Sequence, residues 1–224
     1  MKKLIFSALA CLTVLFTSFG QFKEGHIKYD LEINMDPDDP SAEMMSTMME
    51  GSTLDIYFQN QNSRSEIQMG KMMKMVVVVE AESGNTLTLM SGLFGKKAIQ
   101  ANINDDDLGN KDEELDYEIK LVNETKTIIG YTCKKAILTN KQDGTEMTAW
   151  YTDEFNVYKK GINFMQEQIP GAPLEFEMDM NGLGLKVTAT NIEKSLSSKG
   201  LFDLSVPNGY DITSLDELNK MGGQ

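Results

Sequence analysis

The sequence predicts a mainly β protein of the α+β kind, a curved antiparallel sheet or half-barrel with a few short helices on its concave face. Three observations predict this. Short apolar segments recur along the whole chain, and most are bounded by Gly, Asn, Asp or Pro, as antiparallel connections require. In residues 26–34, apolar and charged side chains alternate with the period of two of a half-buried strand. Helical patterns are few.

The predicted strands follow one another as a long meander. They are residues 26–34, 52–60, 63–69, 72–82, 85–91, 96–102, 115–122, 134–140, 146–154, 174–180 and 185–193. A short helix is expected from Pro40 to Glu50. A second is expected at the C-terminus, because Ser214 and Glu217 are spaced as in a capping box. The acidic segments 35–43 and 102–114 are expected to be solvated loops.

The N-terminus has the layout of a secretory signal peptide. Two lysines precede an apolar run over residues 4–16, and small residues follow it up to Gly20. The run is shorter than the roughly 20 residues that a membrane span needs. We therefore expect cleavage of residues 1–20 near Gly20, a single domain over residues 21–224, and a soluble periplasmic or secreted protein.

The charge balance bears on the class of partner. The formal net charge is −13 and becomes −15 if two lysines leave with residues 1–20. Nucleic acid is excluded as a partner, because phosphate binding depends on lysine and arginine. No later segment is apolar enough to span a bilayer, so an integral membrane protein is not expected. The oligomeric state stays open.

Few residues are suited to catalysis or metal binding. His26 is the only histidine, and Cys133 is the only cysteine once Cys11 is removed, so neither a disulfide nor a zinc cluster is expected. Residues 104–115 resemble a calcium loop, but Leu108 and Leu115 stand where oxygen ligands belong. We expect no catalysis, no metal and no cofactor.

Cys133 permits two interpretations. The two lysines that follow it would lower the pKa of an exposed thiol and make it reactive. Burial as a small apolar residue is favoured, because free cysteine is among the most buried residue types. Neither face of this strand is cleanly apolar, which indicates a bulge at Lys134–Lys135.

Methionine is the compositional outlier, with 16 residues, eight of them in two clusters. Three interpretations stay open: ordinary core, a pliable surface for an acyl chain or apolar peptide, and thioether capture of Cu(I). Trp150 and Tyr151 are adjacent, so a strand sends one to the core and the other to solvent or ligand. The predicted ligand-binding residues are Met44, Met45, Met48, Met49, Met73, Met75 and Trp150.

Several segments resemble a known family. "ETKTIIGYTCKKA", "TAWYTDE", "GAPLEFEM" and "VTATNIEKS" resemble a secreted family of Gram-negative bacteria with I-x-GY-x-CKKA and W-Y/V-T segments. This family looks related to the GLPGLI family, although "NGLGLKVTATN" lacks the proline of the GLPGLI motif. Both are similar in pattern to periplasmic lipoprotein carriers.

The resemblance implies a curved sheet around short helices, with an apolar hollow for acyl chains and no catalytic residues. The expected function is therefore the binding of an apolar ligand, such as a lipid or a lipoprotein acyl chain. The alternatives are a methionine-rich Cu(I)-binding protein and a structural or interaction module of the cell envelope.

Overall fold

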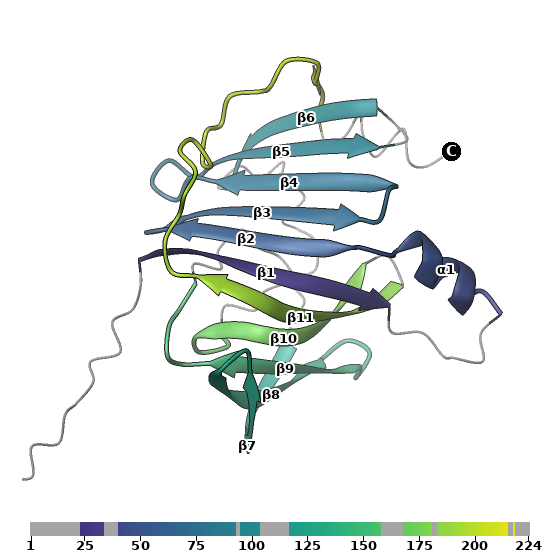
Figure 1. The fold of residues 1–224 in the computed structure, drawn as a ribbon, viewed down its shortest axis with the longest axis vertical. Helices are drawn as coiled ribbons and strands as arrows, with labels where there is room; N and C mark the ends of the chain where they lie inside the picture. Colours follow the sequence, from purple (N-terminus) through teal and green to yellow (C-terminus); the bar gives the residue numbers. More distant parts are fainter. Residues whose placement is uncertain are drawn as a thin grey trace, which may run out of the picture.

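The computed structural model describes residues 23–33, 40–92, 95–103, 117–157, 168–180, 183–214 and 217, and they form one open sheet of 12 strands (Figure 1). The order across the sheet is β12-β6-β5-β4-β3-β2-β1-β11-β10-β9-β8-β7. Helix α1 spans Ala42–Met48. The strands are β1 (Glu24–Ile33), β2 (Thr53–Gln59), β3 (Asn62–Met69), β4 (Met73–Val79), β5 (Asn85–Gly92), β6 (Gly95–Asn102), β7 (Tyr117–Ile128), β8 (Tyr131–Asn140), β9 (Glu146–Thr152), β10 (Ala172–Met180), β11 (Leu183–Glu193) and β12 (Asp211–Ile212).

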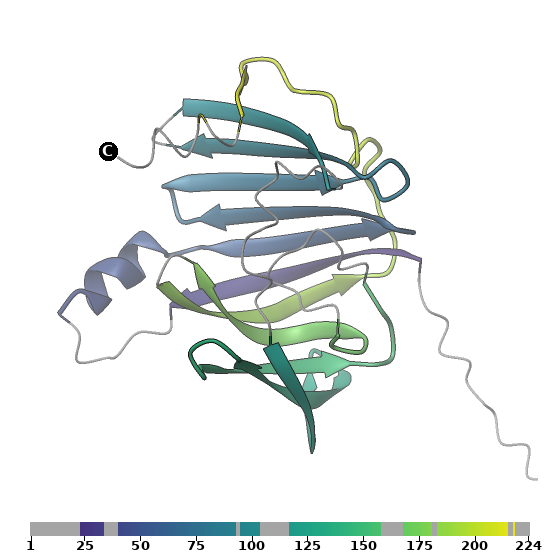
Figure 2. The same cartoon turned by 180° about the vertical axis from the view of Figure 1, so that it is seen from behind.

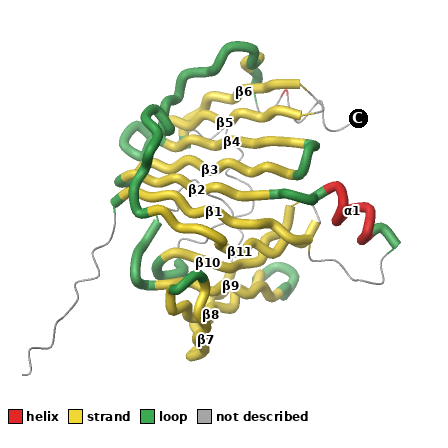
Figure 3. Tube along the Cα trace, viewed as in Figure 1, coloured by secondary structure: helices red, strands yellow, loops and turns green. Residues whose placement is uncertain are grey.

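The predicted fold class is confirmed. Every predicted strand segment forms a strand, and all pairings are antiparallel except that of β12 with β6. The short strand β12, which the sequence pattern did not predict, pairs Asp211 with Lys97 and Ile212 with Ala98. Figure 3 shows how far strands outweigh helices in the described residues.

The sheet has two faces of different character. Directly opposed residues of antiparallel strands share a face. The pairings therefore place Ile27, Leu54, Ile67, Val187 and Phe176 on one side, which we call the inner face. This face carries the larger cluster of buried residues, drawn from β1–β3 and β7–β11. Figure 2 looks onto it.

The outer face carries a smaller apolar cluster under residues 201–210, which we call the strap. Val76, Val78, Leu87, Leu89 and Ala98 are buried there. The strap packs on them with Phe202, Leu204, Val206 and Tyr210. In Figure 3 it is the loop that crosses the sheet on the viewer's side.

Two hydrogen bonds from the outer face hold the strap in place. The Arg64 side chain donates to the Leu201 carbonyl over 3.1 Å, and the Gln100 side chain donates to the Leu204 carbonyl over 3.2 Å. The strap thereby covers apolar side chains that β4, β5 and β6 would otherwise expose.

Helix α1 lies beyond the ends of the strands, beside the start of β2, and not over the middle of the inner face (Figures 1 and 2). None of its residues is buried. The predicted C-terminal helix lies mostly outside the described residues. Its capping box is confirmed, because Ser214 N donates to Glu217 Oε2 over 3.4 Å and Glu217 N donates to Ser214 Oγ over 3.2 Å.

Candidate functional site

Four methionines line one end of the inner face. Met69 of β3 pairs with Met73 of β4, and Met75 of β4 pairs with Met90 of β5, so all four side chains share the inner face. Met69 is buried, whereas Met73, Met75 and Met90 are half-buried. We call these four residues the methionine row. Because thioether side chains are unbranched and polarizable, the row is a pliable apolar surface.

The C-terminal end of helix α1 is fixed to the β3–β4 turn next to this row. Gly70 in the turn has φ +49, and a Cβ there would overlap the Met48 carbonyl oxygen. Gly70 N donates to Ser52 Oγ over 2.9 Å, and Ser52 Oγ donates to the Met49 carbonyl over 2.6 Å. These contacts hold Met49 in the core, where it is 4% exposed.

The predicted ligand-binding methionines separate into two environments. Met73 and Met75 lie on the inner face, as their spacing predicted, and pack against the core that contains Met49. Met44 and Met48 lie on the surface, 60% and 41% exposed, and Met45 is half-buried. Convergence of all four helix methionines with Met72 or Met75, which Cu(I) binding by these residues requires, stays a prediction.

The other end of the inner face is lined by hydroxyl groups. Ser63 and Ser65 of β3 are buried. The pairings place Thr86 and Thr88 of β5 on the same face, on the far side of β4. These hydroxyls are not among the predicted ligand-binding residues, although Ser63 and Ser65 are polar residues at the inward, apolar phase of "SRSEIQM".

Trp150 lies on the outer face, away from the methionine row. It pairs with Lys135 and Glu175, whereas its neighbour Tyr151 is 3% exposed in the core. The prediction that the two rings occupy opposite faces is confirmed. The Lys126 Nζ lies 4.5 Å from the centre of the Trp150 ring, as in a cation–π contact, and 2.7 Å from Glu175 Oε1.

Cys133 is fully buried, as the favoured interpretation predicted. Burial raises the pKa of its thiol to about 11, an effect that outweighs the lowering by the Ile128 backbone and by Lys126. The thiol is therefore protonated at neutral pH and is not a nucleophile. The expected bulge is present at this position, but on the partner strand: the β7–β8 register shifts between Val122 and Thr125.

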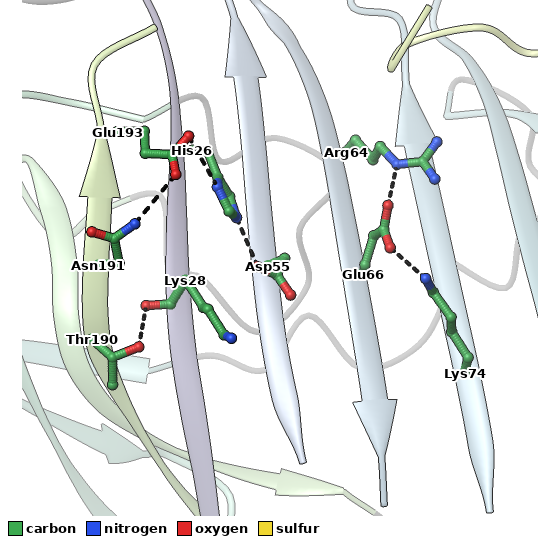
Figure 4. A network of polar contacts seen from close by, with 9 residues as sticks. All are labelled: His26, Lys28, Asp55, Arg64, Glu66, Lys74, Thr190, Asn191 and Glu193. Atoms are coloured by element: carbon green, nitrogen blue, oxygen red, sulfur yellow. Dashed lines mark hydrogen bonds and ion pairs between the residues drawn. The ribbon is translucent and has the colours of Figure 1, made fainter. Parts of the chain in front are cut away.

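His26 belongs to a polar network on the outer face (Figure 4). Its Nε2 lies 2.7 Å from Asp55 Oδ1, and its ring stacks on Tyr57 with 4.2 Å between the ring centres. Burial and the negative charge of Asp55 raise the pKa of Tyr57. The other ring nitrogen of His26, Nδ1, lies 3.9 Å from Glu193 Oε2.

Farther along the same face, Glu66 bridges two cations (Figure 4). Its carboxylate lies 2.7 Å from Arg64 Nε and 2.6 Å from Lys74 Nζ. Partial burial alone would raise the pKa of Glu66, but the hydrogen bonds from Lys74 and Arg64 lower it. The network ties β3 to β4 on the side opposite to the methionine row.

Two further results concern the described residues as a group. They contain no cluster of three or more His, Cys, Asp or Glu side chains placed to hold a metal ion. Among the same residues, no helix is long and apolar enough to cross a membrane.

Comparison with solved structures yields low similarities. PNGF-II, in its C2 and P21 crystal forms, matches with TM-scores of 0.48 and 0.47 at 18% and 17% identity. Each match covers 89% of this chain but only 32% and 33% of PNGF-II, so the chain spans about a third of that protein's length. LprF from Mycobacterium bovis matches with a TM-score of 0.31 at 13% identity, over 86% of this chain and 91% of LprF.

A LolA superfamily protein from Nitrosomonas europaea matches with a TM-score of 0.22 at 10% identity, over 81% of this chain and 90% of that protein. No curated protein sequence matches the chain significantly. The specific resemblance to the GLPGLI family is not tested by these comparisons and stays a prediction.

One family is established by a direct sequence match. The sequence model described as "N-glycanase peptide, N-terminal domain" matches residues 104–218, which include strands β7–β12 and the strap. The sequence motifs considered above did not predict this family. Because the match covers just over half of the 224 residues, the chain belongs to the family of N-glycanase peptide N-terminal domains.

Proposed function

We propose that this chain is an exported, non-catalytic binding module that takes an apolar ligand, such as a lipid or acyl chain, on the inner face of its sheet. The observation that carries the proposal is the methionine row, where Met73, Met75 and Met90 stay half-buried side by side on adjacent strands. Burial of apolar surface supplies about 25 cal/mol per Å², so a few hundred Å² of acyl chain gains several kcal/mol before ordering costs.

The proposal is tested by displacement of an uncharged fluorescent probe, N-phenyl-1-naphthylamine, from the purified chain. We expect the double variant Met75→Gln, Met90→Gln to weaken probe binding about tenfold, because two apolar contacts become polar. The matched control is Ile212→Gln, which changes a 68% exposed residue on the edge strand β12. Equal binding by both variants and the unchanged chain would contradict the assignment to the inner face.

A second experiment addresses the ligand in the cell. The chain is purified from its native envelope fraction under mild conditions, and co-purifying molecules are identified by mass spectrometry. Lipid or lipoprotein present in the unchanged chain and depleted in the double methionine variant supports carriage. Retention of the same molecules by both proteins argues against the methionine row as the binding surface.

The family match favours a second candidate function, in which this chain binds a glycan and assists a glycanase activity that lies elsewhere. The matched residues include Trp150, whose ring lies half-buried on the outer face between Lys126 and Lys135. Aromatic rings beside polar groups are a common recognition surface. Since Trp150 is the only tryptophan, quenching or enhancement of its fluorescence by a soluble N-glycan reports on this surface directly.

The non-catalytic part of the proposal is tested separately. The purified chain is incubated with a denatured N-glycosylated protein, and released glycans are measured by mass spectrometry. We expect no release above a buffer control. Release that depends on His26 or Asp55 would make this chain an enzyme and overturn the proposal.

A further inference from the structure

The inner face of β3, β4 and β5 changes from polar to apolar along the strands. Ser63 and Thr86 lie at one end, on either side of Val79. The methionine row lies at the other end. From Ser63 to Met69, β3 advances six residues, which corresponds to about 20 Å. The face therefore has a hydroxyl end and a thioether end separated by the length of an extended acyl chain.

Ser63 is the unusual member of the hydroxyl end. Ser63 is only 1% exposed. Among the described residues, its Oγ is the one buried side-chain oxygen or nitrogen without a hydrogen-bond partner. Thr86 Oγ1, in contrast, donates to the Ala101 carbonyl over 3.3 Å. A buried hydroxyl without a partner is destabilising, and a ligand that supplies a partner removes this penalty.

The inner face of these three strands carries no charge. The pairings place Ser63, Ser65, Ile67, Met69, Met73, Met75, Val77, Val79, Thr86, Thr88, Met90 and Gly92 on it. The charged residues of β3 and β4, namely Arg64, Glu66 and Lys74, lie on the outer face, where Glu66 forms ion pairs with both cations. A charged ligand group placed at Ser63 would lose its hydration without gaining an ionic partner from these strands.

We propose that this face binds an uncharged amphiphile lengthwise, with its hydrogen-bonding end at Ser63 and its hydrocarbon chain along the methionine row. Fatty alcohols and monoacylglycerols have this chemistry, and ionised fatty acids do not. The inference rests on the proposed apolar-ligand function and specifies the class of ligand. It also gives the unpartnered Ser63 hydroxyl a role that core packing does not give it.

The test compares three ligands with the same hydrocarbon chain: myristyl alcohol, myristate and tetradecane. Each is titrated against N-phenyl-1-naphthylamine bound to the full chain. We expect the alcohol to bind at least about fivefold more tightly than ionised myristate at neutral pH. Ser63→Ala should weaken binding of the alcohol about fivefold, the effect of one neutral hydrogen bond, and leave tetradecane unchanged.

Two variants control for non-specific effects of substitution. Ser198→Ala makes the same chemical change at an exposed position and should leave all three affinities unchanged. Ser63→Thr keeps a hydroxyl and should retain part of the preference for the alcohol. It also preserves the test if Ser63→Ala does not fold.

The outcomes separate the two proposals. If the alcohol and tetradecane bind, but Ser63→Ala behaves as Ser198→Ala or myristate binds as well as the alcohol, the amphiphile inference is wrong and the apolar-ligand function stands. If neither the probe nor any of the three ligands binds, the apolar-ligand function itself is wrong.

Discussion

Individual residues in this protein are explained by which face of the sheet they occupy. Cys133 is followed by two lysines in the sequence, yet its thiol is fully buried, and burial dominates its chemistry. Trp150 and Met75 were both predicted to touch ligand, but they lie on opposite faces. For each of these side chains, the cross-strand partner decides the environment more than the neighbours in sequence do.

The raised pKa of Cys133 predicts a loss of stability at alkaline pH. The thiol ionises near pH 8.5 in an unfolded chain but near pH 11 in the folded protein. The unfolded state therefore releases its proton first. The contribution of Cys133 to stability should be constant below about pH 8 and fall by up to about 3 kcal/mol as the pH rises to 11.

Urea unfolding at a series of pH values measures this effect. Cys133→Ala should show a shallower fall between pH 8.5 and pH 10 than the unchanged chain. Burial also raises the pKa of Tyr29, so both proteins lose further stability above about pH 10. Identical slopes below that pH would contradict the assigned burial of the thiol.

Replacement of Ser63, in contrast, should raise the stability of the protein. Replacement by Ala removes a buried hydroxyl without a partner at little change in volume, so the ligand-free protein should gain about 1 kcal/mol of unfolding free energy. Ser198→Ala, at an exposed site, should be neutral. A measured loss of stability in Ser63→Ala would show that the hydroxyl is already hydrogen-bonded in the ligand-free protein.

At the scale of elements, close contacts between turns and neighbouring segments position the inner face. The β3–β4 turn meets the end of helix α1 at Gly70, and this contact carries Met49 into the core. The strap acts on the outer face in a comparable way, since it covers the apolar side chains of β4–β6. Both contacts join parts of the chain that are far apart in sequence.

Gly70→Ala should destabilise the protein strongly. The residue has φ +49, and the new Cβ would overlap the Met48 carbonyl oxygen, so we expect a loss of at least about 3 kcal/mol. Gly130→Ala is the matched control, because Gly130 has φ +87 with no atom near the position of a Cβ. It should lose only about 1 kcal/mol. Equal losses in chemical denaturation would show that the α1 contact is not rigid.

The strap should protect the edge of the sheet from local opening. Phe202→Asp replaces an apolar contact to the outer cluster with a charge, and amide hydrogen exchange in β6 should then become faster. Exchange in β8, at the other side of the sheet, should not change. Asn208→Asp, which adds the same charge at an exposed position within the strap, is the control. Unchanged exchange in β6 would mean that the strap contributes little to the stability of this edge.

At the scale of the whole molecule, the open sheet gives one chain two different surfaces. The inner face combines a large core with a half-buried methionine row. The outer face combines the Trp150 cluster, the His26–Asp55 pair and the strap. Binding of an apolar ligand to the inner face and binding of a polar partner to the outer face can therefore be tested with separate variants. The double variant Met75→Gln, Met90→Gln should weaken binding of the apolar ligand and leave glycan binding unchanged. Trp150→Phe should weaken glycan binding and leave apolar-ligand binding unchanged. Separate binding assays with the two ligands measure both effects.

The sequence by itself determined strands β1–β11, their antiparallel connections and the capping box of Ser214 and Glu217, and it favoured the burial of Cys133. These follow from local period, turn chemistry and side-chain type. Only the tertiary structure decided that Met69 and Met73 meet Met75 and Met90, that Trp150 faces away from them, that α1 lies at the strand ends, and that Ser63 is buried without a partner. The physical reason is strand register: the pairing of one strand with the next selects which side chains of different strands lie together on a face, and the pattern within a single strand does not encode that choice.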